Sequence, residues 1–136
     1  MKKLGIIAAL LVCLNVTTLY AQNEVEPKIL NPASAIPELN GTYAIFQNDN
    51  LVRNGKIDKY GIYLGFPISL YSVEKDGNTT NLYVKHNGSK PKTEGECIEG
   101  DTVKEGYCYK LIQVIQTGTG KYTLKEAGNE IKIEKI

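Results

Sequence analysis

From residue 41 to the end of the chain, hydrophobic and polar residues alternate in short runs, and turn-forming residues separate one run from the next. A period of two is typical of strands with one buried face, whereas a helix would place apolar residues three and four positions apart. The pattern therefore predicts strands throughout. Eight are expected, over residues 42–47, 51–53, 60–64, 68–75, 79–86, 107–116, 121–127 and 130–135.

Two of these strands carry apolar residues on both faces, and we expect both faces to be covered. One contains Ile68, Leu70, Tyr71 and Val73, and the other contains Leu111, Ile112, Val114 and Ile115. An open sheet would expose its edges and one apolar face. Because the connections look local, we expect an all-β fold, a single antiparallel meander of about eight strands closed as a small barrel. A two-layer β-sandwich is the alternative.

The last hairpin predicts which of its residues face the core. Gly128-Asn129 is a two-residue turn signal, which places Ala127 opposite Glu130. One face of the hairpin then carries Tyr122, Leu124, Ile131 and Ile133. The other face carries Thr123, Lys125, Lys132 and Glu134 and is expected to meet water.

The N-terminal segment has the three parts of a secretory signal peptide. A basic start, an apolar run over residues 4–14 and a polar stretch lead to a cleavage site after Ala21, so residues 1–21 are interpreted as the signal. The sequence around Cys13 also resembles a bacterial lipobox, but Val12 stands where a small residue is usual. Cys13 is therefore interpreted as an apolar residue of the signal core. The protein is expected to be exported, either periplasmic or secreted.

Residues 22–40 contain Pro27, Pro32 and Pro37 with little hydrophobic periodicity, which predicts an extended arm ahead of an all-β domain over 41–136. Removing Lys2 and Lys3 with the signal changes the formal net charge from +1 to −1. A nearly neutral surface argues against nucleic acid and anionic membranes as partners. The apolar run of the signal is interrupted too soon for a stable membrane span.

Cys97 and Cys108 are the cysteines that remain after removal of the signal, and an acidic stretch lies between them. Export favours their oxidation to a disulfide. The closed loop is the candidate binding element, with Glu96, Glu99, Asp101, Tyr107 and Tyr109 as its candidate residues. Tyr107 and Tyr109 are two positions apart and should point to the same side of their strand.

The chain lacks the motifs of familiar catalytic and metal sites. Its one histidine, His86, precedes the turn signal Asn87-Gly88 and is interpreted as a solvent-facing turn residue. One histidine and two oxidised cysteines do not form a zinc ligand set, and the acidic loop lacks the pattern of an EF-hand. We therefore expect no catalytic residue, no metal and no cofactor.

Leu39-Asn40-Gly41-Thr42-Tyr43 resembles the Leu-x-Gly-x-Trp opening of lipocalin-like calycin barrels, with Tyr43 in place of the tryptophan. The resemblance implies a small barrel whose aromatic residue plugs the closed end, and a hydrophobic ligand inside. A Gly before a strand whose Tyr belongs to an ordinary core is the other interpretation.

These observations favour an exported, non-enzymatic β-barrel binding module that contacts a protein or small ligand through its loops. The alternatives are a lipocalin-like carrier of a hydrophobic ligand, a structural or inhibitory envelope protein, and a hydrolase that uses carboxylates. Asn40, Asn78 and Asn87 each begin an N-glycosylation acceptor triplet, which matters only in a eukaryotic source.

Overall fold

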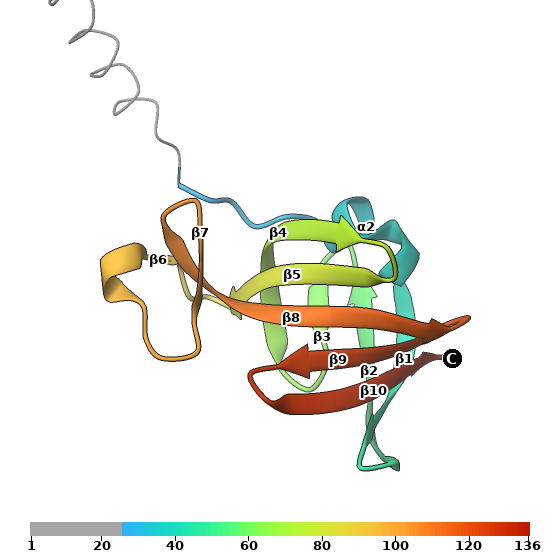
Figure 1. The fold of residues 1–136 in the computed structure, drawn as a ribbon. Coiled ribbons are helices and arrows are strands. Elements are labelled where there is room, and N and C mark those ends of the chain that lie inside the picture. The colour runs from blue at the N-terminus through green and yellow to red at the C-terminus, as the bar shows by residue number, and fades with distance from the viewer. Residues whose placement is uncertain (1–25) are drawn as a thin grey trace, which may run out of the picture.

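The computed structural model describes residues 26–136. The predicted signal peptide, with Cys13, lies outside the described residues. The elements are α2 (Pro32–Ala35), η1 (Pro37–Leu39), β1 (Gly41–Gln47), β2 (Asn50–Asp58), β3 (Gly61–Tyr63), β4 (Pro67–Asp76), β5 (Thr79–His86), β6 (Lys92–Thr93), η2 (Glu94–Glu96), β7 (Thr102–Lys104), β8 (Tyr107–Gly118), β9 (Lys121–Glu126) and β10 (Asn129–Lys135) (Figure 1).

The strands form one antiparallel sheet that closes on itself as a barrel. Each of β1 to β4 pairs with the strand that follows it in the chain, β8 pairs with β9, β9 pairs with β10, and β10 pairs with β1. Pairing of β5 with β8 closes the ring, with Tyr83 opposite Leu111. The expected eight-stranded meander barrel is confirmed. Two short strands, β6 and β7, pair with β8 outside the ring, in an excursion that runs from residue 87 to residue 106.

The period-two pattern puts about two side chains from each barrel strand inside the ring. These positions form two layers between the two ends of the barrel. The layer nearer α2 and η1 contains Tyr43, Ile57, Ile62, Leu70, Leu82, Val114, Tyr122 and Ile133. The layer at the other end contains Ile45, Leu64, Ile68, Val84, Ile112, Leu124 and the half-buried Ile131. Gly55 occupies the remaining inward position, on β2.

Gly55 is required by a close approach of β3. A Cβ atom at this position would lie 2.4 Å from the backbone oxygen of Tyr63 and 2.9 Å from Cδ1 of Ile45. Contacts under 3.0 Å force a shift, and here one of the contacting atoms belongs to the backbone. The missing side chain therefore lets β2 bend against β3 at this point of the ring.

One end of the barrel is plugged by the two helical turns that precede β1. Ile36 and Leu39 are 0% and 2% exposed and belong to the barrel core. The hydroxyl of Tyr43 donates a 2.6 Å hydrogen bond to the carbonyl oxygen of Leu39. Tyr43 is 0% exposed and thus lies buried at the closed end of the barrel.

The expectation of an extended arm is corrected for residues 32–39. Pro32 and Pro37 stand at the first positions of α2 and η1, where a missing backbone N–H costs nothing and the fixed φ suits a helical turn. Asn31 caps α2 through a 3.0 Å bond from the backbone nitrogen of Ala33. Burial of Ile36 then anchors the segment to the barrel.

Charged groups fix this plug to two strands. The Glu38 carboxylate lies 2.7 Å from Nζ of Lys75 on β4, and Nζ of Lys135 donates to the Glu38 backbone oxygen at 2.9 Å. Burial alone would raise the pKa of Glu38, but the hydrogen bond from Lys75 holds that pKa below its ordinary value. The closed end is therefore held by both apolar packing and ion pairing.

The register of the last hairpin differs from the prediction. Its two-residue turn is Ala127-Gly128, with positive φ at both residues, and Glu126 pairs with Asn129. Leu124 therefore faces Ile131. The pairing is displaced by two residues, an even number, so the expected apolar face is retained. On the opposite face, Thr123 is 8% exposed, so the expectation that it meets water is wrong.

A second apolar cluster lies on the outside of the barrel, under the excursion. Tyr71, Tyr83 and Tyr109 form its centre, with ring centroids of Tyr109 5.9 and 6.0 Å from the other two, and Tyr107 and Leu111 pack against them. Nζ of Lys104 lies 4.6 Å above the Tyr83 ring and pairs with Glu74. Four of the nine tyrosines of the chain belong to this cluster or pack against it. Tyr107 and Tyr109 share one side of β8, as expected.

Within residues 26–136, the helices are too short and too polar for any of them to cross a membrane.

Candidate functional site at the barrel mouth

The end of the barrel opposite the plug, here called the mouth, is hollow. Two cavities of about 220 and 390 Å³ open there and share Phe66, Ile68, Ile112 and Glu126 among their lining residues. Their apolar walls are completed by Leu64, Val84, Leu124 and Ile131. These are the inward residues of the layer farther from the plug. The interior is therefore packed at the closed end and open at the mouth.

Phe66 and His86 stack at the lip of the mouth. Their ring centroids are 5.6 Å apart and their planes differ by 5°. Phe66 is 50% exposed, a large exposure for a phenylalanine, and His86 is exposed, as the sequence predicted. The bend between β3 and β4 carries Phe66, and the end of β5 carries His86. The pair lines the larger cavity.

Lys85 ties the disulfide loop to the barrel rim. Its Nζ lies 3.9 Å from Oδ2 of Asp101, and the two side chains are 11% and 3% exposed. The Asp101 carboxylate also accepts a 3.3 Å hydrogen bond from the backbone nitrogen of Ile98. A buried charge is costly unless it is paired. This pair therefore fixes the loop beside the mouth.

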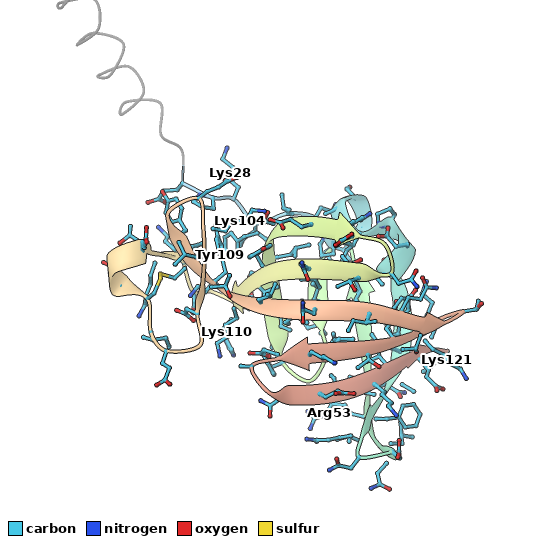
Figure 2. The ribbon with its side chains drawn as sticks, in the orientation of Figure 1. Lys28, Arg53, Lys104, Tyr109, Lys110 and Lys121 are labelled. Carbon is cyan, nitrogen blue, oxygen red and sulfur yellow. A yellow bond between two sulfur atoms is a disulfide. The ribbon has the colours of Figure 1, made fainter. Side chains whose placement is uncertain are left out.

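A second ion pair joins Lys110 to Glu126. It lies between the apolar mouth and a neighbouring polar cleft, which is described below. Nζ of Lys110 lies 3.6 Å from Oε1 of Glu126, with the side chains 56% and 31% exposed. Figure 2 shows Lys110 at the mouth end of β8 and Lys121 at the opposite end of the barrel. Both members of the pair line the larger cavity and also the neighbouring cleft.

The cleft, of about 480 Å³, separates the disulfide loop from the hairpin formed by β9 and β10. The loop contributes residues 98–102, and the hairpin contributes residues 125–130. Ile98 stands at its edge with 61% of its surface exposed. The cleft is polar and contains side chains of both charges, whereas the mouth is mainly apolar.

The predicted disulfide is present. Cys97 and Cys108 are bonded, with their Cα atoms 5.5 Å apart. Such a bond is typical of proteins in an oxidising, exported compartment. It joins the end of η2 to the start of β8 and so holds the acidic loop beside the mouth.

The candidate loop residues divide into three groups. Glu99 and Asp101 line the cleft, although the Asp101 side chain is nearly buried against Lys85. Glu96 is exposed on η2, away from the cavities described above. Tyr107 and Tyr109 belong to the outer tyrosine cluster, where Tyr109 is 3% exposed. Burial raises the pKa of the Tyr109 phenol, which keeps it neutral in this packed setting.

The sulfur atoms of Cys97 and Cys108 and a carboxylate oxygen of Asp101 lie within 4.8 Å of one another. The thiolate is the form of cysteine that binds metals, and neither sulfur is a thiolate in a disulfide. The arrangement is therefore a stapled loop in the oxidised protein.

The sequence did not single out the mouth residues. Ile68 and Ile112 were expected on doubly covered strands, but nothing in the alternation separates an inward residue that fills the core from one that lines a cavity. Lys110 and Glu126 lie far apart in the sequence and meet only because β8 and β9 are neighbours. Phe66 offered the one local signal, because it is an aromatic residue between Gly65 and Pro67, two residues typical of bends.

Comparison with protein-family models, with curated proteins and with solved structures gives no match to this chain. Function is therefore inferred from the geometry of the mouth and the cleft.

Proposed function

We propose that the protein is an exported, non-enzymatic binding module whose barrel mouth takes up the apolar part of a small ligand. The observation that carries this proposal is the pair of cavities at one end of a barrel whose other end is plugged. The larger, of about 390 Å³, falls in the range of small-molecule sites, which are concave, mainly apolar and equipped with a few polar groups.

The composition of the mouth supports this assignment. Branched aliphatic and aromatic side chains make its walls, and charged side chains stand only at its rim, at Lys85, Lys110 and Glu126. Transfer of an apolar group from water to such walls is favourable by about 25 cal/mol per Å². Lys110 and Glu126 remain near water, where their charges cost little and can orient a ligand.

The test is binding of an uncharged single-chain probe, decanol, measured by calorimetry and by the shift in unfolding temperature. Ile131 is half-buried and lines the smaller cavity, so Ile131→Trp should fill part of the mouth and abolish binding. Leu51→Trp is the matched control, because Leu51 is 62% exposed and lies outside both cavities. It should bind decanol like the wild type.

Two results would contradict the proposal. One is failure of the folded wild type to bind decanol or any other apolar probe. The other is equal binding by wild type and Ile131→Trp, with circular dichroism showing both folded, since the probe would then be bound elsewhere.

A second candidate function is recognition of a protein through the disulfide loop, and the exposure of Ile98 favours it. A large aliphatic side chain held at the edge of a cleft by a disulfide is a suitable contact for a partner. Ile98→Asp together with Glu99→Ala should then abolish capture of one specific exported protein. The same capture by both forms would exclude the loop as the contact.

A further inference from the structure

We propose that the ligand of the mouth is a single-chain amphiphile with an anionic head group, a carboxylate in the simplest case, and that Lys110 binds this head group. This inference rests on the proposed function, because it assumes that the apolar part of the ligand enters the mouth. It adds the charge of the ligand and the residue that recognises it.

The distribution of charge around the larger cavity favours an anion. The charged residues in its lining are Lys85 and Lys110, which are cationic, and Glu126, which is anionic. Asp101, which pairs with Lys85, lines the cleft and not this cavity. A head group at the lip of the mouth therefore meets more cationic than anionic side chains.

The ammonium groups at the rim retain hydrogen-bonding capacity. Nζ of Lys110 is 3.6 Å from Glu126, and Nζ of Lys85 is 3.9 Å from Asp101. Charged N–H···O hydrogen bonds are normally about 2.7–2.9 Å long. Since each ammonium carries several donors, an incoming carboxylate can bind Lys110 without breaking a short hydrogen bond.

The position of these groups matches the shape of an amphiphile. The walls below the rim are apolar, and burial of an isolated carboxylate among them would be costly. At the rim, Lys110 is 56% exposed, so the head group stays hydrated while it contacts the ammonium. The apolar chain then points toward the packed layer near the plug. Glu126 opposes this arrangement, because its carboxylate competes for Lys110 and repels the head group.

The experiment compares three probes that differ only in head group, each kept below its aggregation concentration. Calorimetry with wild-type protein should give decanoate the highest affinity, decanol an intermediate one and decyltrimethylammonium the lowest. Lys110→Met should weaken decanoate binding by about three- to fivefold, the range of an exposed ion pair, and should change decanol binding by a smaller factor. Glu126→Gln should strengthen decanoate binding.

Lys132→Met is the matched control for Lys110→Met. Lys132 is 58% exposed and lies 3.4 Å from Asp49, so it has nearly the same exposure and the same kind of ion pair, but it lies outside the mouth cavities. Decanoate binding should be the same in this variant as in the wild type at equal ionic strength. An equal loss in both variants would show a general effect of protein charge and would overturn the assignment to Lys110.

The outcomes separate this inference from the proposed function. Equal affinity for decanoate and decanol, or preference for decyltrimethylammonium, would overturn the anionic head group and leave the apolar mouth intact. Absence of binding by all three probes would overturn the proposed function itself. Loss of decanol binding in Lys110→Met would show that the lysine supports the mouth and does not select the charge.

Discussion

Replacement of Ile36 by alanine tests whether the segment before β1 is part of the barrel. Ile36 is 0% exposed and lies among the core residues of the ring, between the two helical turns that close one end. Removal of most of this side chain leaves a cavity between the plug and the packed layer. Buried aliphatic residues replaced by alanine typically cost about 2–5 kcal/mol, from lost transfer energy and the cavity together.

The matched control is Ile29→Ala in the same segment. Ile29 is 60% exposed, so the same chemical change should alter the free energy of unfolding by less than about 0.5 kcal/mol. Urea unfolding followed by circular dichroism gives both values. An Ile36→Ala protein within about 0.5 kcal/mol of the wild type would show that the segment is dispensable, as an extended arm would be. Equal losses in both variants would refute the assignment of burial to Ile36.

Three further perturbations test other parts of the fold. Gly55→Ala should lower the free energy of unfolding by about 1–3 kcal/mol, because the new Cβ meets the Tyr63 backbone. Gly95→Ala is the control and should change this free energy little, because no atom lies within 4 Å of the added Cβ. A Gly55→Ala protein as stable as the wild type would argue against the close approach. The double variant Cys97→Ala, Cys108→Ala should have a free energy of unfolding about 3 kcal/mol lower than the wild type, the chain-entropy value for a separation of 11 residues. Reductant should lower the stability of the wild type only. Equal unfolding midpoints for the double variant and the oxidised wild type would contradict this. Burial raises the pKa of Tyr71, Tyr83 and Tyr109, so their contribution to stability is complete below the ordinary tyrosine pKa of about 10 and is lost as pH rises through the higher folded values. The check is the absorbance of tyrosinate in a pH titration of the folded protein. If all tyrosines ionised near the ordinary pKa of about 10 before the protein unfolded, the buried cluster would be contradicted.

The strands of the barrel could be predicted because alternation and turn residues agree over most of the chain. The expected strand at 79–86 coincides with β5, and most of the others differ by one or two residues at their ends. The main exception is β2, expected over 51–53 and observed over Asn50–Asp58. Gly55 and the polar residues around it hide the alternation there, because the inward position has no side chain.

The plug was not predictable from local pattern. Pro32 and Pro37 were interpreted as signs of extended backbone, but a proline also suits the first turn of a helix. Tertiary burial of Ile36 decides between the two, and no neighbouring residue in the sequence reveals it. The turn of the last hairpin could not be predicted from local pattern either. Gly128-Asn129 is as suitable a two-residue turn as Ala127-Gly128, and the pairing of β10 with β1 contributes to the register.

The candidate site was predicted only in part. The disulfide was predicted from two cysteines and the expectation of export. The role of the tyrosines did not, because a strand pattern cannot show that an excursion of the chain covers the outer face of β5 and β8. Tyr109 therefore lies in a packed cluster and not on a binding surface. The cavities at the mouth exist because the inward side chains of one layer do not fill the barrel there. The filling of a layer depends on how all eight strands close into a ring, and the sequence pattern does not show this.

The most direct test of ligand binding at the mouth is a methyl-resolved NMR titration of isoleucine-labelled protein with decanol. Ile68, Ile112 and Ile131 line the mouth, whereas Ile36 and Ile57 lie near the plug. We predict chemical-shift changes in the first three that saturate with probe concentration, and none beyond the noise in the other two. Saturating changes confined to Ile36 and Ile57, or no saturating change in any of the five, would contradict the account.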